Sequence, residues 1–273
     1  MGVSMSNPTG TSIGMSLLRI EDRGPIRVIT LSNPARRNAL SLAMIGELHA
    51  ALRAAGGTRA IRAVILTGEG PAFCAGHDLK EIQAARVMPD KGRAFFVELM
   101  AACSAMMLEI RMMPQPVIAA IEGIATAAGC QLVASCDLAI AGADAKFATP
   151  GVNIGLFCST PMVALSRNVT NKHAMEMLLT GEMIDAATAH RFALANRVAA
   201  AGEAFATALD LASLIAAKPA AVVTLGKEAF YRQKEMSLEA AYSYTSSVMV
   251  ENMLMREAGE GIGAFVGKTP SPG

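Results

Sequence analysis

A short apolar run followed by a turn and a helical pattern recurs along the first part of this chain, and this alternation restricts its fold most. The runs and the helical patterns after them lie at residues 63–66 and 95–112, at 117–121 and 127–135, and from 138 onward. Upstream, two further runs flank Gly24 and Pro25 and are typical of a β-hairpin. Strands that alternate with helices predict an α/β fold, and the paired, irregularly spaced strands favour stacked ββα units over a doubly wound sheet.

Helical patterns predominate after Pro161, and no strand pattern stronger than residues 196–198 interrupts them. Several of these helices carry Ala and Met on more than one face, which indicates packing against other subunits. The composition changes near Ala201 and Gly202. We therefore predict a disordered tail at residues 1–15, an α/β core that holds the functional site at 16–201, and a helical oligomerisation region at 202–273.

Composition argues against two classes of partner. Hydrophobic residues make up 52% of the chain, yet polar residues interrupt every stretch of about eighteen residues, so no membrane span is expected. With 24 Lys and Arg against 23 Asp and Glu, the net charge of +1 provides no field that would attract nucleic acid.

The five cysteines indicate a reducing compartment, because their number is odd and none pair as C-x-x-C. Their spacing predicts neither a disulfide framework nor a zinc site, and no metal is expected. Residues 1–15 lack the features of a targeting peptide. We therefore expect a bacterial cytoplasm in preference to a mitochondrial matrix.

Two glycine-containing segments predict a site that stabilises negative charge. Residues 127–129 place small side chains at a predicted helix start, where free N–H groups and the helix dipole favour an anion. Gly76, in the segment 73–80, lies beside another free amide, and the two loops could supply two donors to one oxygen. Taken alone, the same glycines also fit simple turns.

Several motifs together resemble the crotonase superfamily, the enoyl-CoA hydratase and isomerase family, over about residues 17–268. The motifs that carry this resemblance are Asn33-Pro34 with Arg37-Asn38-Ala39-Leu40, Cys74-Ala75-Gly76-x-Asp78-Leu79-Lys80, Pro116-Val-Ile-Ala-Ala-Ile-x-Gly123, Ser135-Cys136-Asp137, Met177-Leu178-Leu179-Thr180-Gly181-Glu182 and Glu260-Gly261-x-x-Ala264-Phe265-x-x-Lys268.

The resemblance implies a fold, a ligand and a set of site residues. The fold would be a crotonase-type spiral of ββα units with a helical C-terminal trimerisation region, assembled as a homotrimer or a dimer of trimers. The ligand would be an acyl-CoA thioester of fatty-acid metabolism, and the backbone amides of His77 and Ala128 would form the oxyanion hole for its enolate. CoA is part of the substrate, and no other cofactor is expected. The implied CoA-binding residues are Arg37, Ala39, Leu40, Ala75, Asp78, Leu79 and Lys80, with Phe265 and Lys268 reaching a neighbouring subunit's CoA.

The family's hydratases carry two glutamates at positions where this chain has Gln131 and Gly151. Glutamine can hydrogen-bond a water molecule but cannot usefully exchange a proton, and glycine offers no side chain. Each acid or base contributes roughly 10²–10⁴ in rate, so efficient hydration by the two-glutamate mechanism is not expected. The segments 148–153 and 155–161 are similar to those of a subgroup called enoyl-CoA hydratase domain-containing, with a mitochondrial animal branch, that lacks both glutamates.

Two hypotheses on function follow from this pattern. The first is a lyase or isomerase of the family that stabilises a thioester enolate by another route. The second is a catalytically weak acyl-CoA-binding or assembly protein. A serine peptidase of the same fold is not expected, because the chain has no Gly-x-Ser-x-Gly elbow.

Other side chains could replace the missing acid and base. The side chain of His77 is one candidate, and Cys158 is a conceivable nucleophile, although Ser159 and Thr160 before Pro161 fit a helix cap better. The remaining candidates are carboxylates that also fit exposed or structural roles: Asp90, Glu98, Glu109 and Glu122.

Overall fold

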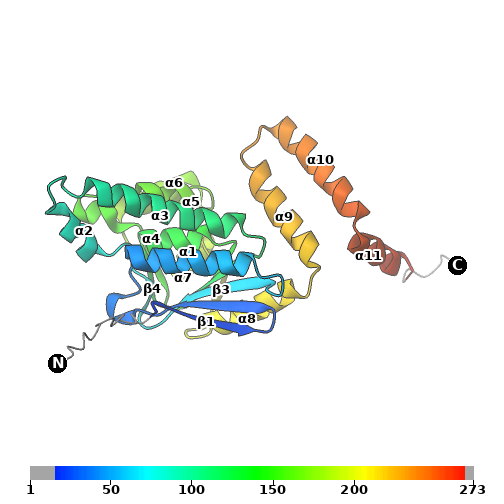
Figure 1. Cartoon of the computed structure of the whole chain (residues 1–273), viewed down its shortest axis with the longest axis horizontal. Coiled ribbons are helices and arrows are strands. Elements are labelled where there is room, and N and C mark those ends of the chain that lie inside the picture. The colour runs from blue at the N-terminus through cyan, green and yellow to red at the C-terminus, as the bar shows by residue number, and fades with distance from the viewer. Residues whose placement is uncertain (1–15, 268–273) are drawn as a thin grey trace, which may run out of the picture.

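The structure is a computed structural model that describes residues 16–267, so the predicted tail and Lys268 lie outside the described residues. Within them the strands form two sheets (Figure 1). The larger sheet has the order β1 (Leu18–Arg23), β2 (Ile26–Leu31), β3 (Ala63–Gly68), β5 (Val117–Ile121), β7 (Leu138–Gly142) and β10 (Arg197–Ala199). The smaller sheet has the order β4 (Ala72–Cys74), β6 (Ile124–Thr126), β8 (Lys146–Ala148) and β9 (Ile184–Asp185).

Helices cover these sheets and extend beyond them at the C-terminal end. They are α1 (Leu42–Gly56), α2 (Leu79–Arg86), α3 (Arg93–Met112), α4 (Ala128–Ser135), α5 (Ser159–Leu165), α6 (Asn171–Thr180), α7 (Ala186–Arg191), α8 (Ala204–Ala216), α9 (Ala220–Gln233), α10 (Leu238–Leu254) and α11 (Arg256–Val266). The predicted α/β class and the β1–β2 hairpin are both confirmed.

Three successive pairs of strands produce the spiral of ββα units. The first strand of each pair (β3, β5, β7) joins the larger sheet, the second (β4, β6, β8) joins the smaller one, and the neighbours run parallel. Helices α2 with α3, α4 and α5 follow these pairs in turn. The sequence did not predict β4, β6 and β8, because strands of three residues are too short to display alternation.

The larger sheet has a hydrophobic core on each face. Along β3, Val64 and Leu66 belong to the main core, whereas Ala63 and Ile65 belong to a second core that includes Ala208 of α8. Burial on both faces explains the continuous apolar runs of β3 and β5. Helix α8 packs on the sheet, so it belongs to the core and not with the helices that follow it. The boundary near residue 202 stays a prediction.

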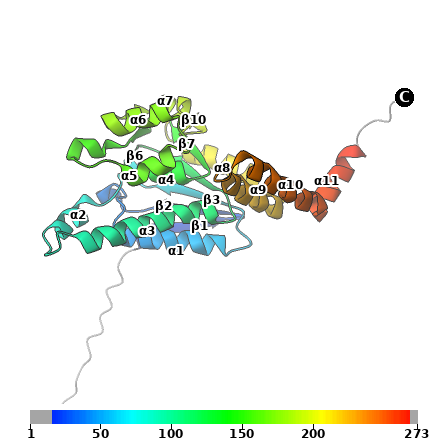
Figure 2. The same cartoon turned by 90° about the horizontal axis from the view of Figure 1, so that it is seen from above.

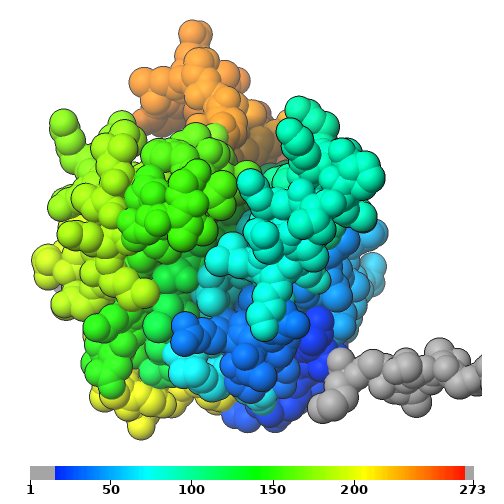
Figure 3. Space-filling model, turned by 90° about the vertical axis from the view of Figure 1, so that its left-hand side faces the viewer, coloured from blue at the N-terminus to red at the C-terminus, as the bar shows by residue number. Residues whose placement is uncertain are grey.

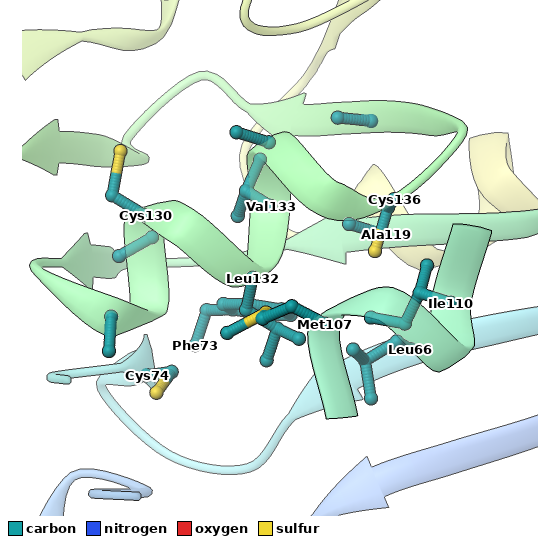
Figure 4. Close-up of a cluster of buried hydrophobic side chains, with 14 of the residues drawn as sticks. Leu66, Phe73, Cys74, Met107, Ile110, Ala119, Cys130, Leu132, Val133 and Cys136 are labelled. Carbon is teal, nitrogen blue, oxygen red and sulfur yellow. The ribbon is translucent and has the colours of Figure 1, made fainter. Parts of the chain in front are cut away.

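Helix α4 lies inside the main core. All its residues are buried, and Figure 4 shows Leu132 and Val133 of α4 in one cluster with Phe73 from β4 and Met107 from α3. A helix that is enclosed on all sides cannot shift without disturbing this packing. The N-terminus of α4, which starts at Ala128, therefore has a fixed position.

Helices α9, α10 and α11 form an arm that leaves the core (Figures 1 and 2). A buried ion pair fixes its base: the Lys227 ammonium lies 2.8 Å from the carboxylate of Asp137 and donates to the carbonyls of Ile110 and Gln115. The Tyr231 hydroxyl donates to the same carboxylate at 2.8 Å. Burial lowers the pKa of Lys227, and Asp137 opposes that effect.

We also compared the helices with the requirements of a membrane span. Among residues 16–267, no single helix is long and apolar enough to cross a membrane. Helices α8 and α9 meet the criterion only as a pair that is bent by 107°.

Candidate functional site

A cavity of about 510 Å³ lies between α2, α3, the start of α4 and the segment 150–161. Figure 3 shows the side of the molecule on which the cyan α2–α3 region meets the green segment that follows α4. The predicted site residues His77, Ala128 and Gly151 line this cavity, as do Ala75 and Leu79. The fold therefore brings together three sequence segments that were singled out separately.

Two glycines set the distance between the predicted oxyanion donors. A Cβ atom at Gly76, where φ is +88°, would lie 2.9 Å from the Thr126 carbonyl oxygen and 3.2 Å from the Ala128 nitrogen. Gly129 abuts the carbonyl of Cys74 so closely that it has no room for a side chain. Only glycine permits this contact between the loop after β4 and the start of α4.

The amides of His77 and Ala128 are both unused within the described part of the chain, since neither donates a hydrogen bond to another residue there. Ala128 is the first residue of α4, so its N–H also lies at the positive end of the helix dipole. The preceding Ala127 has φ 50° and ψ −118°, which costs roughly 1–3 kcal/mol for a residue with a side chain. The packing around α4 therefore holds this backbone in a strained conformation.

Backbone hydrogen bonds join the predicted CoA loop to the loop after β4. The Ala75 N–H donates to the Arg37 carbonyl at 3.0 Å, the Leu40 N–H to the Gly76 carbonyl at 2.8 Å, and the Asp78 N–H to the Leu40 carbonyl at 3.3 Å. The two loops thus form one rigid wall, with the exposed Arg37 at its edge.

Three further predicted CoA residues, Asp78, Leu79 and Lys80, lie at the start of α2. Asp78 caps the helix by accepting a hydrogen bond from the Lys80 N–H at 2.9 Å, and its carboxylate pairs with Arg36 at 2.6 Å. Lys80 and Leu79 are exposed, whereas Ala39 is buried. Asp78 therefore organises the loop, and Lys80, like Arg37, is an exposed cation.

The imidazole of His77 also belongs to the cavity wall. Its Nε2 atom is buried and has no hydrogen-bond partner among residues 16–267. Burial lowers the pKa of His77 to about 4, so the ring is neutral at physiological pH.

Gly151 has no room for a glutamate. A Cβ atom there would lie 2.8 Å from the carbonyl oxygen of Leu156 and 3.0 Å from the sulfur of Cys158. The prediction that Ser159 or Thr160 caps α5 is wrong, because the N-cap residue is Cys158, which makes no side-chain capping bond. Hydroxyl-rich residues before a proline suggested a cap, but the helix already begins at Ser159. Burial raises the pKa of the Cys158 thiol, which disfavours the nucleophilic thiolate.

Gln131 does not line the same cavity as Gly151. It is buried one turn of α4 after Ala128 and lines a second cavity of about 320 Å³ between α3, α4, α5 and α9. The Oε1 atom of Gln131 has no hydrogen-bond partner in the described part of the chain. Thr160 lines both cavities, so they are neighbours.

Within residues 16–267, no carboxylate lines the first cavity. Asp90 accepts hydrogen bonds at the start of α3, and Glu109 lies 3.7 Å from His49. Glu122 accepts the first N–H of α8 at 2.8 Å, and Glu98 is exposed. The four candidate carboxylates thus have structural or surface positions. Nor does any group of three or more metal-binding side chains occur in this range.

We missed the apolar wall of the first cavity at the sequence level. Phe96, Leu99 and Met100 of α3 contribute this wall. Their spacing at i, i+3 and i+4 is the signal of an apolar helix face, which could have identified them. Phe265, predicted to reach a neighbouring CoA, is exposed on α11 at the far end of the arm.

The chain is similar to known proteins in both sequence and overall structure. A family model described as Enoyl-CoA hydratase/isomerase matches residues 21–272. The Rattus norvegicus protein called Enoyl-CoA hydratase domain-containing protein 3, mitochondrial, is 44% identical over 263 residues, which cover 96% of this chain and 86% of the relative. A crystal structure of enoyl-CoA hydratase from Mycobacterium smegmatis has a TM-score of 0.88 and 47% identity, covering 94% of this chain and 98% of the other. The crystal structure of human enoyl Coenzyme A hydratase domain-containing protein 3 has a TM-score of 0.87 and 44% identity, and the match covers 94% of this chain and 100% of the other.

The same comparisons confirm the predicted resemblance and contradict the predicted location. The relatives from rat, mouse and human are all named as mitochondrial proteins. The prediction of a bacterial cytoplasm in preference to a mitochondrial matrix is therefore wrong. It rested on cysteine content, which cannot separate two compartments that are both reducing, and on the composition of residues 1–15, which lie outside the described residues.

Proposed function

Because this chain belongs to the enoyl-CoA hydratase/isomerase family, we propose that it binds a fatty acyl-CoA thioester and stabilises the enolate of that thioester. The donors are the backbone amides of His77 and Ala128. The observation that carries this proposal is that both amides border one cavity and are unused within residues 16–267. The contact at Gly76 holds their loops together.

The chemistry follows from charge development in the substrate. No carboxylate of residues 16–267 lines the cavity, so a base from the solvent takes the proton from the α-carbon of the thioester. The C–H electron pair then moves toward the carbonyl, whose oxygen becomes negative, and two fixed N–H donors stabilise this oxygen more than the neutral carbonyl. Removing one such donor costs roughly 10²–10³ in rate in other enzymes. The CoA moiety runs past the wall formed by residues 37–40 and 74–78, where Arg37 and Lys80 are exposed cations that attract its phosphates.

Efficient water addition is not part of the proposal. Gln131 carries no exchangeable acid proton, Gly151 has no room for a side chain, and no carboxylate of residues 16–267 lines the first cavity. The same observation favours the second candidate function, an acyl-CoA-binding or assembly protein with little turnover. We also propose a homotrimer or dimer of trimers, supported by the apolar surface of the C-terminal arm.

Calorimetry of the full chain with free CoA and with butyryl-CoA tests the binding site. Gly76→Ala inserts a methyl group between the two donor loops, so we expect butyryl-CoA affinity to fall by roughly tenfold, with a smaller effect on free CoA. Gly24→Ala is the matched control, because Gly24 also has a positive φ but has nothing within 4 Å of its Cβ position. Equal losses for CoA and butyryl-CoA would contradict the assigned donors.

Deuterium exchange at the α-carbon of butyryl-CoA, followed by mass spectrometry, separates the two candidate functions. Enzyme-dependent exchange that Gly76→Ala slows supports enolate stabilisation. Tight binding without exchange or enoyl-CoA hydration supports the binding protein. Turnover of a 2-enoyl-CoA at the rate of an ordinary hydratase would overturn our conclusion on hydration.

A further inference from the structure

The second cavity carries an excess of positive charge. Arg111, Arg167 and Lys234 line it, and Asp137 is the only carboxylate that does so within the described residues. Asp137 is already paired with Lys227, whose ammonium lies 2.8 Å away. A cleft lined by one sign of charge concentrates ions of the opposite sign.

Two of the three cations have no counter-ion in the described part of the chain. Arg111 places its guanidinium carbon 4.4 Å from the ring centroid of Tyr231 and pairs with no carboxylate there. Lys234 donates to the carbonyl of Arg167 at 3.2 Å and also has no carboxylate partner among these residues. Arg167 lies 3.5 Å from Glu235, but both side chains are exposed to water, which weakens that pair.

The second cavity lies where the distal end of an acyl chain would arrive. Ala128 lines the first cavity and Gln131 the second, and the two residues are separated by almost one turn of α4, roughly 5 Å along the helix axis. Thr160 lines both cavities on the opposite element, α5. An acyl chain whose carbonyl binds at Ala128 therefore needs only a few carbon atoms to reach the second cavity.

The neutral side chain at position 131 agrees with an anionic ligand. A glutamate there would add a negative charge to the wall of the second cavity and would repel an anion within a few ångströms. Gln131 removes this repulsion, while Arg111 and Lys234 supply attraction.

We propose that the second cavity binds the distal end of the acyl group and selects acyl-CoA thioesters whose acyl chain ends in a carboxylate. This inference rests on the proposed function, because it requires the thioester to bind beside Ala128. On this proposal, the glutamine at position 131 affects which substrate binds as well as which reaction is possible.

Calorimetry of the full chain with matched pairs of saturated acyl-CoA thioesters tests the proposal. The members of each pair have equal chain length, and one ends in a methyl group and the other in a carboxylate. For chains that reach the second cavity, we expect the carboxylate member to bind about tenfold tighter or more. Arg111→Met and Lys234→Met should each reduce this preference, and Arg111→Lys should keep part of it. Arg53→Met, on the exposed side of α1, should leave it unchanged.

The outcomes separate this inference from the proposed function. If neither member of any pair binds, the proposed function fails and this inference fails with it. If the methyl-ended thioesters bind and no carboxylate-ended partner binds tighter, only this inference fails. A wild-type preference that survives both Arg111→Met and Lys234→Met would also overturn it. The inference is also overturned if the wild type shows no preference and Arg111→Met loses the oligomer. In that case a carboxylate of a second copy would occupy the cavity.

Discussion

His77 contributes two groups to the first cavity, and burial affects them differently. The backbone amide keeps its donor capacity because it is unused in residues 16–267. The imidazole loses its charge, because burial lowers its pKa to about 4. At neutral pH the ring therefore adds no positive charge to the proposed oxyanion site, and its buried Nε2 is a weak proton acceptor.

The titration of His77 should destabilise the protein in mild acid. The unfolded chain binds a proton at His77 below about pH 6.5, whereas the folded chain resists it down to about pH 4. The free energy of unfolding therefore keeps the full contribution of the buried neutral imidazole above pH 6.5 and loses it as the pH falls toward 4. We expect His77→Leu to lose about 2 kcal/mol less than the wild type in free energy of unfolding between pH 7 and pH 4.5. Denaturant titrations at both pH values measure this, and identical pH dependences would refute the assignment.

Gly151 makes a second prediction at the scale of one residue. Gly151→Ala should lower the free energy of unfolding by roughly 1–3 kcal/mol, because the new methyl group meets the Leu156 carbonyl and the Cys158 sulfur. Gly46→Ala is the control: Gly46 is an exposed residue of α1 with open space around its Cβ position, and alanine there should stabilise by roughly 0.5–1 kcal/mol. Because Gly151 has no room for a longer side chain, Gln131→Glu with Gly151→Glu should gain little hydratase activity. A stable Gly151→Ala variant would show that the loop can move aside.

Among the elements, the long ones could be predicted from the sequence and the short ones could not. Strand β2 and helices α3, α8 and α9 display their periodicity over enough residues to be recognised, and β3 and β5 are recognised as continuous apolar runs. Helix α2 and the second strand of each pair do not. The position of the second cavity was also beyond sequence reasoning, because its wall combines α3, α4, α5 and α9, whose packing depends on tertiary contacts.

The position of α9 should depend on the carboxylate of Asp137. Asp137→Ala leaves the Lys227 ammonium, whose side chain is only 6% exposed, without its counter-ion, and we expect a loss of about 3–5 kcal/mol in the free energy of unfolding. Tyr231→Phe removes a single hydrogen bond to the same carboxylate and should cost about 0.5–1.5 kcal/mol. Chemical denaturation of both variants tests this order. Similar costs would mean that the ion pair does not fix the arm.

At the scale of the whole molecule, the C-terminal arm exposes many large apolar side chains. The exposed side chains of α10 and α11 include Leu238, Tyr242, Met249, Val250, Met253, Leu254, Ile262, Phe265 and Val266. Many exposed apolar side chains along neighbouring helices are typical of a subunit interface.

Charge introduced into the arm should therefore break the proposed oligomer. We expect light scattering to give the mass of a trimer or of a dimer of trimers for the wild type, and a smaller mass for Leu254→Asp, because an unpaired carboxylate is costly inside an apolar interface. Val87→Asp provides the control, since Val87 is as exposed as Leu254 but lies at the end of α2, away from the arm (Figure 1). A monomeric wild type would exclude the oligomer outright.

The amides of His77 and Ala128 belong to the main chain. Mutation can therefore remove the acids and bases of such a site more easily than it can remove these two N–H groups. A single codon change can delete a glutamate, but almost none can delete an N–H group; only proline lacks one. The glycine contacts at residues 76 and 129 keep those groups in place without any side chain. A gene for such a protein can therefore gain or lose acids and bases over generations while the two proposed donors persist, so new reactions can arise without a new fold.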